Sequence, residues 1–159
     1  MPKRSFRVGR SRAGLGLFAT KKIKKGAFVV AYTGPRISNA ESARRERRGA
    51  RYMFEINRRW TIDGSSRKNL ARYVNHACRP NARAVLRKGR IVYVALRNIA
   101  PEREITVDYG EEYFDYFLKK TGCLCAACAT KQDVRKSKRT GKLKPSSSAT
   151  ARASRRPDR

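Results

Sequence analysis

The sequence predicts a mainly β body made of several small sheets, with few short helices and a disordered basic tail. Three observations support this fold class. Short runs of β-branched and aromatic residues recur along the first 128 residues, helical periodicity is confined to two short segments, and the last 31 residues contain almost no large apolar side chain. A chain of 159 residues is long enough for one modest domain with a single core and a tail.

The first predicted elements lie in the first half of the chain. Residues 28–32 form a β-branched and aromatic run that ends at Thr33-Gly34-Pro35, which is typical of a strand followed by a turn. Ser38 and Glu41 have the spacing of a capping box, so we expect a short, polar-faced helix over residues 40–48. Residues 52–56 and 60–63 predict two paired strands.

The second half of the body predicts one hairpin, one strand and one helix. Residues 84–86 and 91–96 flank Arg87-Lys88-Gly89-Arg90, a sequence typical of a hairpin turn. Residues 104–107 predict one more strand. Residues 111–120 predict a helix whose apolar side carries Tyr113, Phe114 and Phe117.

The charge of the chain is strongly positive and unevenly distributed. The net charge is +28, and the last 31 residues carry 11 basic against 2 acidic side chains. We expect residues 134–159 to be disordered, because so few apolar groups cannot offset the entropy of ordering. Such a tail either acts as a solvated, solubilising segment or contacts nucleic acid non-specifically through counterion release, and the composition favours the second.

The distribution of apolar residues excludes an integral membrane protein and disfavours a protein secreted with a signal peptide. No apolar run approaches the ~18 residues of a membrane span, so an integral membrane protein is excluded and no membrane partner is expected. The N-terminal sequence MPKRSFRVGR lacks the apolar region of a signal peptide, which indicates an intracellular, reducing compartment.

Four cysteines form a candidate metal site. Cys123, Cys125 and Cys128 lie within six residues, and Cys78 supplies the fourth thiol. Four thiolates suit one structural Zn²⁺ with tetrahedral coordination. Free buried thiols and a disulfide pair are the alternatives, and both are disfavoured by the complete set of four and by the reducing compartment.

Polar residues and glycines mark two further candidate sites. Residues 72–81 concentrate two Asn residues, a Cys and the only His of the chain, and such a cluster is costly to bury unless each group has a partner. Gly14 and Gly16 lie where a backbone could approach a ligand closely. Taken alone, these two glycines are explained better by a glycine-bearing turn, and no βαβ unit follows that would support a dinucleotide fold.

Five motifs occur in a fixed order over residues 5–130, and these are Gly14-Leu15-Gly16; Tyr32-Thr33-Gly34; Asn75-His76-Ala77-Cys78-Arg79-Pro80-Asn81; Glu104-Ile105-Thr106-Val107-Asp108-Tyr109; and Cys123-x-Cys125-x₂-Cys128. This series resembles the SET-domain protein lysine methyltransferases with a post-SET zinc segment. The resemblance implies a SET-domain fold of small sheets, with a C-terminal pseudoknot in which the Tyr109 segment threads beneath the Asn75 loop. It also implies a SET domain over residues 4–117, a post-SET zinc-binding segment over 118–133 and the basic tail over 134–159.

The resemblance also implies an activity and a set of site residues. The expected reaction is methyl transfer from S-adenosylmethionine to the side-chain amine of a lysine. The catalytic residues implied are Tyr109 and its partner Tyr32. The cofactor-binding residues implied are Gly14, Leu15, Gly16, Tyr52, Arg72, Asn75, His76, Tyr109 and Leu124. We expect the substrate to contact Val107, Tyr73 and Glu111, and Zn²⁺ to be held by Cys78, Cys123, Cys125 and Cys128.

The acidic residues support a basic substrate independently of the resemblance. Six acidic side chains fall between residues 102 and 115 in an otherwise cationic chain, which predicts attraction of a Lys-rich protein or peptide. Charge complementarity at a helix N-terminus is the alternative for Glu111 and Glu112. Histones and basic nucleoid or ribosomal proteins are the expected substrates, with association to chromatin or the nucleoid, or to a host nucleus if the protein is exported.

Two function classes follow from these observations. The first is a lysine methyltransferase, in which the small Val107 beside the amine would admit di- or trimethylation. The second is a catalytically idle, zinc-stapled protein that binds nucleic acid or chromatin on the same fold.

Overall fold

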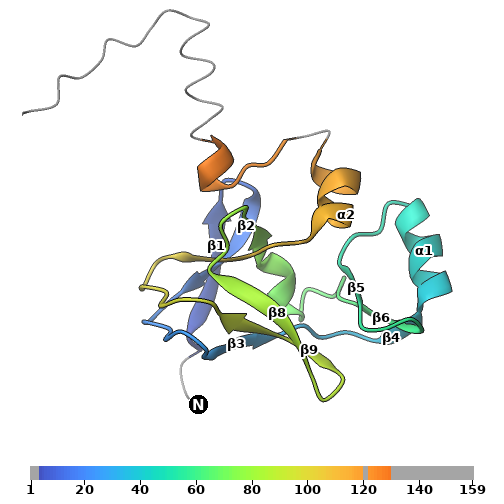
Figure 1. The fold of residues 1–159 in the computed structure, drawn as a ribbon, viewed down its shortest axis with the longest axis horizontal. Helices are drawn as coiled ribbons and strands as arrows, with labels where there is room; N and C mark the ends of the chain where they lie inside the picture. The colour runs from blue at the N-terminus through green and yellow to red at the C-terminus, as the bar shows by residue number, and fades with distance from the viewer. Residues whose placement is uncertain (1–3, 120–121, 130–159) are drawn as a thin grey trace, which may run out of the picture.

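Three small sheets, arranged around a shared core, make up the fold in the computed structural model, which describes residues 4–119 and 122–129 (Figure 1). The first sheet has the strand order β1-β2-β10-β7, with bounds Phe6–Ser11, Gly14–Ala19, Glu104–Val107 and Asn75–His76. The second has the order β3-β9-β8, with bounds Phe28–Ala31, Arg90–Ala95 and Ala82–Arg87. The third has the order β4-β6-β5, with bounds Arg36–Ser38, Trp60–Asp63 and Met53–Glu55.

The first sheet brings the two ends of the domain together. β10 pairs antiparallel with β2 and parallel with β7, where Thr106 lies opposite Asn75. The side chain of Asn81 strengthens this contact, because its amide donates to the Glu104 carbonyl (2.7 Å) and its oxygen accepts from the Thr106 N–H (2.9 Å). β10 is therefore held between β2 and the 75–81 segment, and the SET-domain arrangement expected from the motifs is confirmed.

The second sheet contains the hairpin that the sequence predicts. β8 and β9 pair in register over six residue pairs. The turn residues Lys88 and Gly89 both have positive φ values, 48° and 69°, as a two-residue type I′ turn requires. β8 is longer than predicted, because pairing with β9 extends it over the Ala82–Arg87 segment, whereas β9 has the predicted length and begins one residue earlier.

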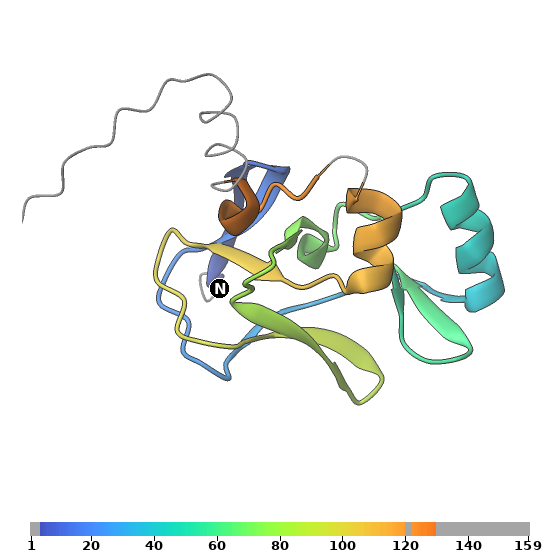
Figure 2. The ribbon, with the colours of Figure 1, turned by 45° about the horizontal axis from the view of Figure 1, so that its top comes forward.

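The third sheet carries the helix α1, Asn39–Arg47. Ser38 caps its N-terminus, and its hydroxyl accepts from the Glu41 N–H at 3.2 Å, which confirms the predicted cap. Arg45 joins the helix to β6 by an ion pair with Asp63 at 2.5 Å. Figures 1 and 2 show α1 at the same end of the molecule as the C-terminal helix α2, with β5 and β6 close to both.

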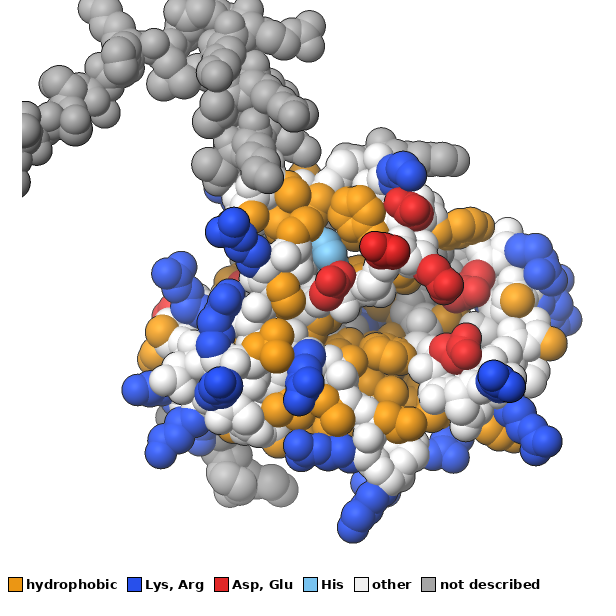
Figure 3. Space-filling view, viewed as in Figure 1, with side chains coloured by type: hydrophobic (Ala, Val, Ile, Leu, Met, Phe, Trp, Pro, Cys, Tyr) orange, Lys and Arg blue, Asp and Glu red, His pale blue; other side chains and the backbone are white. Residues whose placement is uncertain are grey.

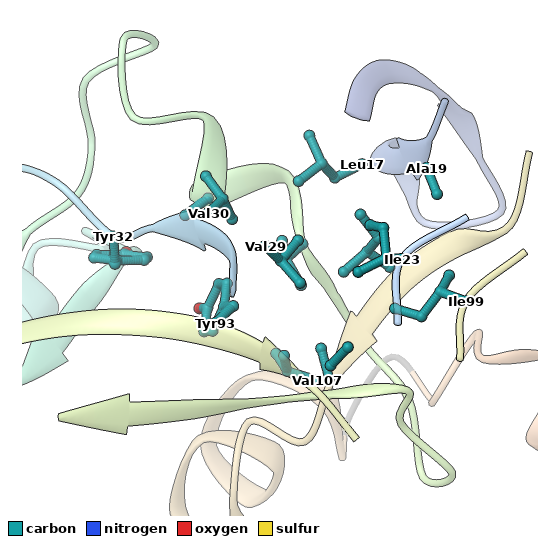
Figure 4. Close-up of a cluster of buried hydrophobic side chains, with 14 of the residues drawn as sticks. Leu17, Ala19, Ile23, Val29, Val30, Tyr32, Tyr93, Ile99 and Val107 are labelled. Atoms are coloured by element: carbon teal, nitrogen blue, oxygen red, sulfur yellow. The ribbon is translucent and has the colours of Figure 1, made fainter. Parts of the chain in front are cut away.

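The core lies between the first two sheets and reaches the third through Tyr32 and Ile62. Leu17 and Ile105 are fully buried where β2 and β10 pair, and Figure 4 shows Leu17 in one cluster with side chains of β3 and β9. Tyr32, Tyr93 and Val107 close this core on the side of the candidate site. The apolar side chains of the candidate site are therefore part of the core of the domain.

Some elements differ from the sequence prediction. β1, β2, β4, β7 and the 3₁₀ helix Leu70–Tyr73 were not predicted. The predicted helix over 111–120 is α-helical only over Glu111–Tyr113 (α2) and continues as a π-helix over Phe114–Leu118 (η2). The side chain of Phe117, residue 120 and the predicted tail 134–159 lie outside what the structure describes. Among the described residues, the model contains no helix long and apolar enough to cross a bilayer.

Candidate active site and metal centre

Tyr109 follows β10 and is held in the interior by its own hydroxyl. The phenol donates to the Val74 carbonyl at 2.7 Å, and the ring meets Tyr113 edge-on with 4.9 Å between centroids. Burial raises the pKa of Tyr109 well above its usual value, and nearby tyrosines add to this effect. The side chain is therefore a neutral phenol at physiological pH.

Tyr32 ends the β3 segment and lies on the other side of the same interior space. Its hydroxyl donates to the Tyr52 carbonyl at 2.6 Å, and its ring packs edge-on against Phe54 (5.3 Å) and Tyr93 (6.3 Å). Burial raises the pKa of Tyr32, and the neighbouring Tyr109 acts in the same direction. Only 6% of Tyr32 is exposed, so its position is fixed by packing.

The hydroxyls of Tyr32 and Tyr109 form the same kind of hydrogen bond. Each O–H is used by a backbone carbonyl, so the free lone pairs of each oxygen can accept from a third group. Neutral phenols of raised pKa do not act as strong bases at pH 7. Tyr32 and Tyr109 are therefore suited to orient an N–H donor and to stabilise positive charge that develops on it.

A cavity of about 920 Å³ opens beside these phenols, here called the acidic cavity. Its apolar wall is formed by Tyr32, Phe54, Tyr93, Val107 and Tyr109. Five acidic side chains from two parts of the chain also line it: Glu46, Glu55, Asp108, Glu111 and Glu112. Figure 3 shows Asp and Glu side chains gathered on one side of a hollow in this face.

A second cavity of about 820 Å³ adjoins the metal centre, here called the polar cavity. Its lining includes Ser11, Asn75, His76 and Leu124. Tyr109 lines both cavities and so forms part of the wall shared by them. An arrangement of this kind can bring one molecule from each side to the same phenol.

The amide of Asn75 has a defined orientation. Its nitrogen donates to the Leu15 carbonyl (3.0 Å) and to the Glu104 carboxylate (2.8 Å), and both of these groups can only accept. The amide oxygen is thereby left to accept a hydrogen bond from a ligand. Gly16 is required here, because a Cβ at this position would come within 2.5 Å of the Glu104 carboxylate.

His76 joins the polar cavity to both Tyr109 and the metal centre. Its Nδ1 accepts from the Tyr109 N–H at 3.2 Å, and its Nε2 lies 3.5 Å from the Cys78 sulfur. Burial lowers the pKa of His76, and the Asp108 carboxylate 3.5 Å away opposes this only in part. His76 is therefore neutral at physiological pH, with its proton on Nε2.

Arg72 presents a cation to the acidic cavity. Its guanidinium stacks on the Tyr52 ring at 4.1 Å and donates to the Ser65 carbonyl at 2.5 Å. Its Nε is buried and has no hydrogen-bond partner within the described residues. A ligand with an acceptor group, such as a carboxylate, would satisfy this orphaned donor, so the position fits the predicted cofactor.

The four cysteines come together as predicted. Their sulfur atoms lie within 4.8 Å of one another, and Cys78 is 3.8 Å from Cys123 and 3.6 Å from Cys128. A regular tetrahedron with Zn–S bonds of ~2.3 Å needs sulfur atoms ~3.8 Å apart, so the set fits zinc. Burial acts to raise the pKa of Cys125, but backbone hydrogen bonds from Cys78 and Cys128 outweigh it and lower the pKa to about 6.

The structure brings most of the predicted site residues to the two cavities. Tyr32, Tyr52, Arg72, Val107 and Glu111 line the acidic cavity, whereas Asn75, His76 and Leu124 line the polar cavity. Leu15 reaches the site through its carbonyl. The predicted cofactor residues are thus divided between the two cavities. Tyr73 lies at neither cavity, because its ring packs against the core.

Sequence reasoning missed a group of residues that position Tyr32. Asn69 is 1% exposed, and its side chain accepts from the Thr33 N–H and donates to the Gly64 carbonyl, both at 3.1 Å. Gly64 lies against the Tyr32 ring so closely that a Cβ would overlap it. The acidic residues Glu46 and Glu55 were also missed. An alignment of homologues would have been needed to find them, because nothing in their local sequence signals a site.

Comparison with known proteins agrees with this geometry. The chain is 36% identical over 126 residues to Histone-lysine N-methyltransferase ASHH1 of Arabidopsis thaliana, covering 73% of this chain and 25% of that protein. It is 36% identical over 136 residues to Histone-lysine N-methyltransferase 2D of Homo sapiens, covering 79% of this chain and 2% of that protein. The chain therefore spans a quarter or less of the length of these relatives.

Solved structures and a family model give the same result. A chain in the crystal structure of the Chaetomium thermophilum polycomb repressive complex 2 superimposes with a TM-score of 0.62 at 32% identity, covering 68% of this chain and 15% of that one. Residues 14–110 match the family model described as SET domain. On this evidence, the chain belongs to the SET domain family.

Proposed function

We propose that this chain is a protein-lysine N-methyltransferase that uses S-adenosylmethionine and acts on a lysine of a basic protein. The observation that carries the proposal is the position of Tyr109, a partly buried, neutral phenol in the wall shared by the acidic and polar cavities. The relatives named as histone-lysine N-methyltransferases support the same reaction.

The residues for the methyl donor are supplied mainly by the polar cavity. S-adenosylmethionine, when bound, supplies a methyl group on a positively charged sulfur. The Asn75 amide oxygen would accept from its amino group, and the orphaned Nε of Arg72 would donate to its carboxylate. Leu124 is 48% exposed and lies between two of the zinc ligands, where it would cover the apolar face of the adenine.

The acceptor lysine would enter through the acidic cavity. A lysine with a pKa of ~10.4 is mostly protonated at pH 7, a penalty of roughly 4–5 kcal/mol for forming the neutral amine. The apolar wall around Tyr32 and Val107 lowers this penalty, because desolvation disfavours the charged amine. The oxygens of Tyr32 and Tyr109 then accept from the amine N–H groups and direct the nitrogen lone pair toward the donor.

The acidic residues support a basic substrate. Glu46 and Glu55 line the same cavity as Glu111 and Glu112, so a peptide there meets carboxylates from both α1–β5 and α2. Side chains of Lys or Arg on either side of the target lysine would be attracted to them. Histones and basic nucleoid proteins fit this requirement, and an enzyme acting on them would associate with chromatin or the nucleoid.

The four cysteines would hold one Zn²⁺. Because the 122–129 segment has little core of its own, the ion would supply much of the energy that keeps Leu124 and Cys123 beside His76. This role is structural, and the reacting amine needs no metal of its own.

Incubation of the protein with S-adenosylmethionine labelled in the methyl group, together with purified histones, tests the proposal. We expect label on a substrate lysine, mapped by mass spectrometry, and its loss in Tyr109→Phe with an unchanged melting temperature. A catalytically idle binding protein would bind nucleic acid but transfer no label to any basic protein. Wild-type activity in Tyr109→Phe would contradict the assigned role of the phenol.

A further inference from the structure

The β8–β9 hairpin carries four exposed cations, and the side chain of a fifth, Arg36 of β4, reaches its turn. They are here called the hairpin cations: Arg36, Arg83, Arg87, Lys88 and Arg90. None of them forms an ion pair within the described residues, whereas Arg7 and Arg45 pair with carboxylates. Because no carboxylate neutralises these side chains, their positive charge can attract an anionic partner.

The hairpin cations are held on a rigid support. Six paired residues and the type I′ turn fix the two strands, and the Arg36 guanidinium donates to the Gly89 carbonyl at 2.7 Å. Arg83 and Arg87 point to the same face of β8, four residues and about 13 Å apart. This separation is comparable with the ~12 Å width of the DNA major groove.

The hairpin also borders the proposed active site. Ala84, between Arg83 and Val85 on β8, lines the acidic cavity together with its partner Tyr93 on β9. Figure 3 shows Asp and Glu on one side of the hollow and Lys and Arg around the opposite side, toward the hairpin tip of Figure 1. Because Ala84 faces the cavity, Arg83 and Arg87 point to the other face of β8. The hairpin cations therefore lie apart from the carboxylates that line the cavity, here called the acidic rim.

We propose that the hairpin cations dock onto the phosphate backbone of duplex DNA, so that the substrate is a basic protein already bound to DNA. Guanidinium groups match phosphate geometry with two parallel hydrogen bonds, and four of the five cations are Arg. A narrow duplex can contact the hairpin without meeting the acidic rim. The substrate part of this inference rests on the proposed function.

The test measures DNA affinity of the full chain by fluorescence anisotropy with a labelled duplex. One variant carries Arg83→Gln, Arg87→Gln and Arg90→Gln. The matched control carries Lys21→Gln, Lys22→Gln and Lys24→Gln. These substitutions remove the same charge from exposed residues outside the hairpin and outside the lining of the acidic cavity. Circular dichroism and melting temperature check that both variants fold.

We expect the hairpin variant to bind more weakly and to reduce the slope of log K against log salt by about 2 to 3, since each phosphate contact contributes about 0.9. The control should change the slope by less than 1. Equal losses in the two variants would overturn the proposal, because net charge alone would then explain binding. Vesicles with anionic lipid that bind as tightly as DNA, and lose affinity in the same variant, would also overturn it.

A second measurement separates this inference from the proposed function. Methyl transfer to histones bound to DNA should fall in the hairpin variant, while transfer to free histone peptides should stay within about twofold of wild type. Unchanged transfer to DNA-bound histones would refute the substrate part. If no variant transfers methyl but the hairpin still governs DNA affinity, the proposed function fails and the docking surface stands.

Discussion

Gly64 lies directly against the ring of Tyr32, and the Gly64→Ala variant tests whether the position of that ring limits the reaction. A carbon atom needs ~3.5 Å from its non-bonded neighbours. The added Cβ would lie well inside this distance from three atoms of the Tyr32 side chain. Because Gly64 does not have a positive φ, the substitution adds a methyl group without backbone strain.

The expected effect follows from how tightly the ring is held. Tyr32 is packed between Phe54 and Tyr93, so it must shift by roughly 1 Å or displace both rings. A displacement of this size can reduce a rate by about 100-fold. Overpacking of this kind costs about 1–3 kcal/mol of stability, and each kcal/mol lowers the melting temperature of a domain of this size by roughly 4 °C.

The assay compares kcat for methyl transfer, KM for S-adenosylmethionine and the melting temperature. We expect kcat to fall by about 100-fold with a nearly unchanged KM, because Gly64 lies at the acceptor side. Gly9→Ala is the matched control, since its Cβ would meet chiefly the movable end of the Arg7 side chain at 2.7 Å. If Gly64→Ala kept wild-type kcat, the placement of the Tyr32 ring would not limit the reaction.

Three further predictions concern the donor side, the pH dependence and the metal. Glu104→Gln should raise KM for S-adenosylmethionine about fivefold, because glutamine can donate as well as accept and no longer fixes the orientation of the Asn75 amide. A Kd for S-adenosylmethionine, measured by calorimetry, that stays constant would contradict this. Because burial raises the pKa of Tyr109, kcat/KM should rise from about pH 7 to about pH 10 as the substrate lysine loses its proton, and a fall of kcat/KM below pH 10 would contradict the neutral phenol. Cys78→Ser should lower zinc from one ion per chain and reduce the melting temperature, as elemental analysis and calorimetry would show.

The elements that the sequence predicted correctly carry local signals. The cap at Ser38 needs only a hydroxyl three residues before Glu41, and the Lys88-Gly89 turn needs two residues that tolerate positive φ. β10 was predicted with its observed bounds, because Glu104–Val107 is short, β-branched and bounded by polar residues. The residues of the metal site were also predictable, since three cysteines within six residues and a single fourth cysteine suit one tetrahedral metal site.

The elements that were missed depend on partners far along the chain. β2 reads as a glycine-bearing turn, and it becomes a strand because β1 on one side and β10 on the other satisfy its backbone groups. The same reason explains the missed acidic rim. Glu46 lies on α1 and Glu55 on β5, and only the tertiary fold brings them to the same cavity as Glu111. Burial and the nearby Glu55 raise the pKa of Glu46, which shows how close the fold holds these carboxylates.

The contacts of Tyr52 depend on its backbone conformation, which the sequence does not reveal. Its backbone has φ 70°, a left-handed conformation that costs a residue with a side chain about 1–2 kcal/mol. In this conformation, the Tyr52 carbonyl accepts both from the Tyr32 hydroxyl (2.6 Å) and from the Gly64 N–H (2.9 Å), while its ring supports the Arg72 guanidinium. One strained residue therefore sets the hydrogen bonding of the acceptor phenol and the position of a cation proposed to bind the methyl donor. The family resemblance predicts a tyrosine near the cofactor, but these contacts depend on a backbone angle that the sequence pattern does not encode.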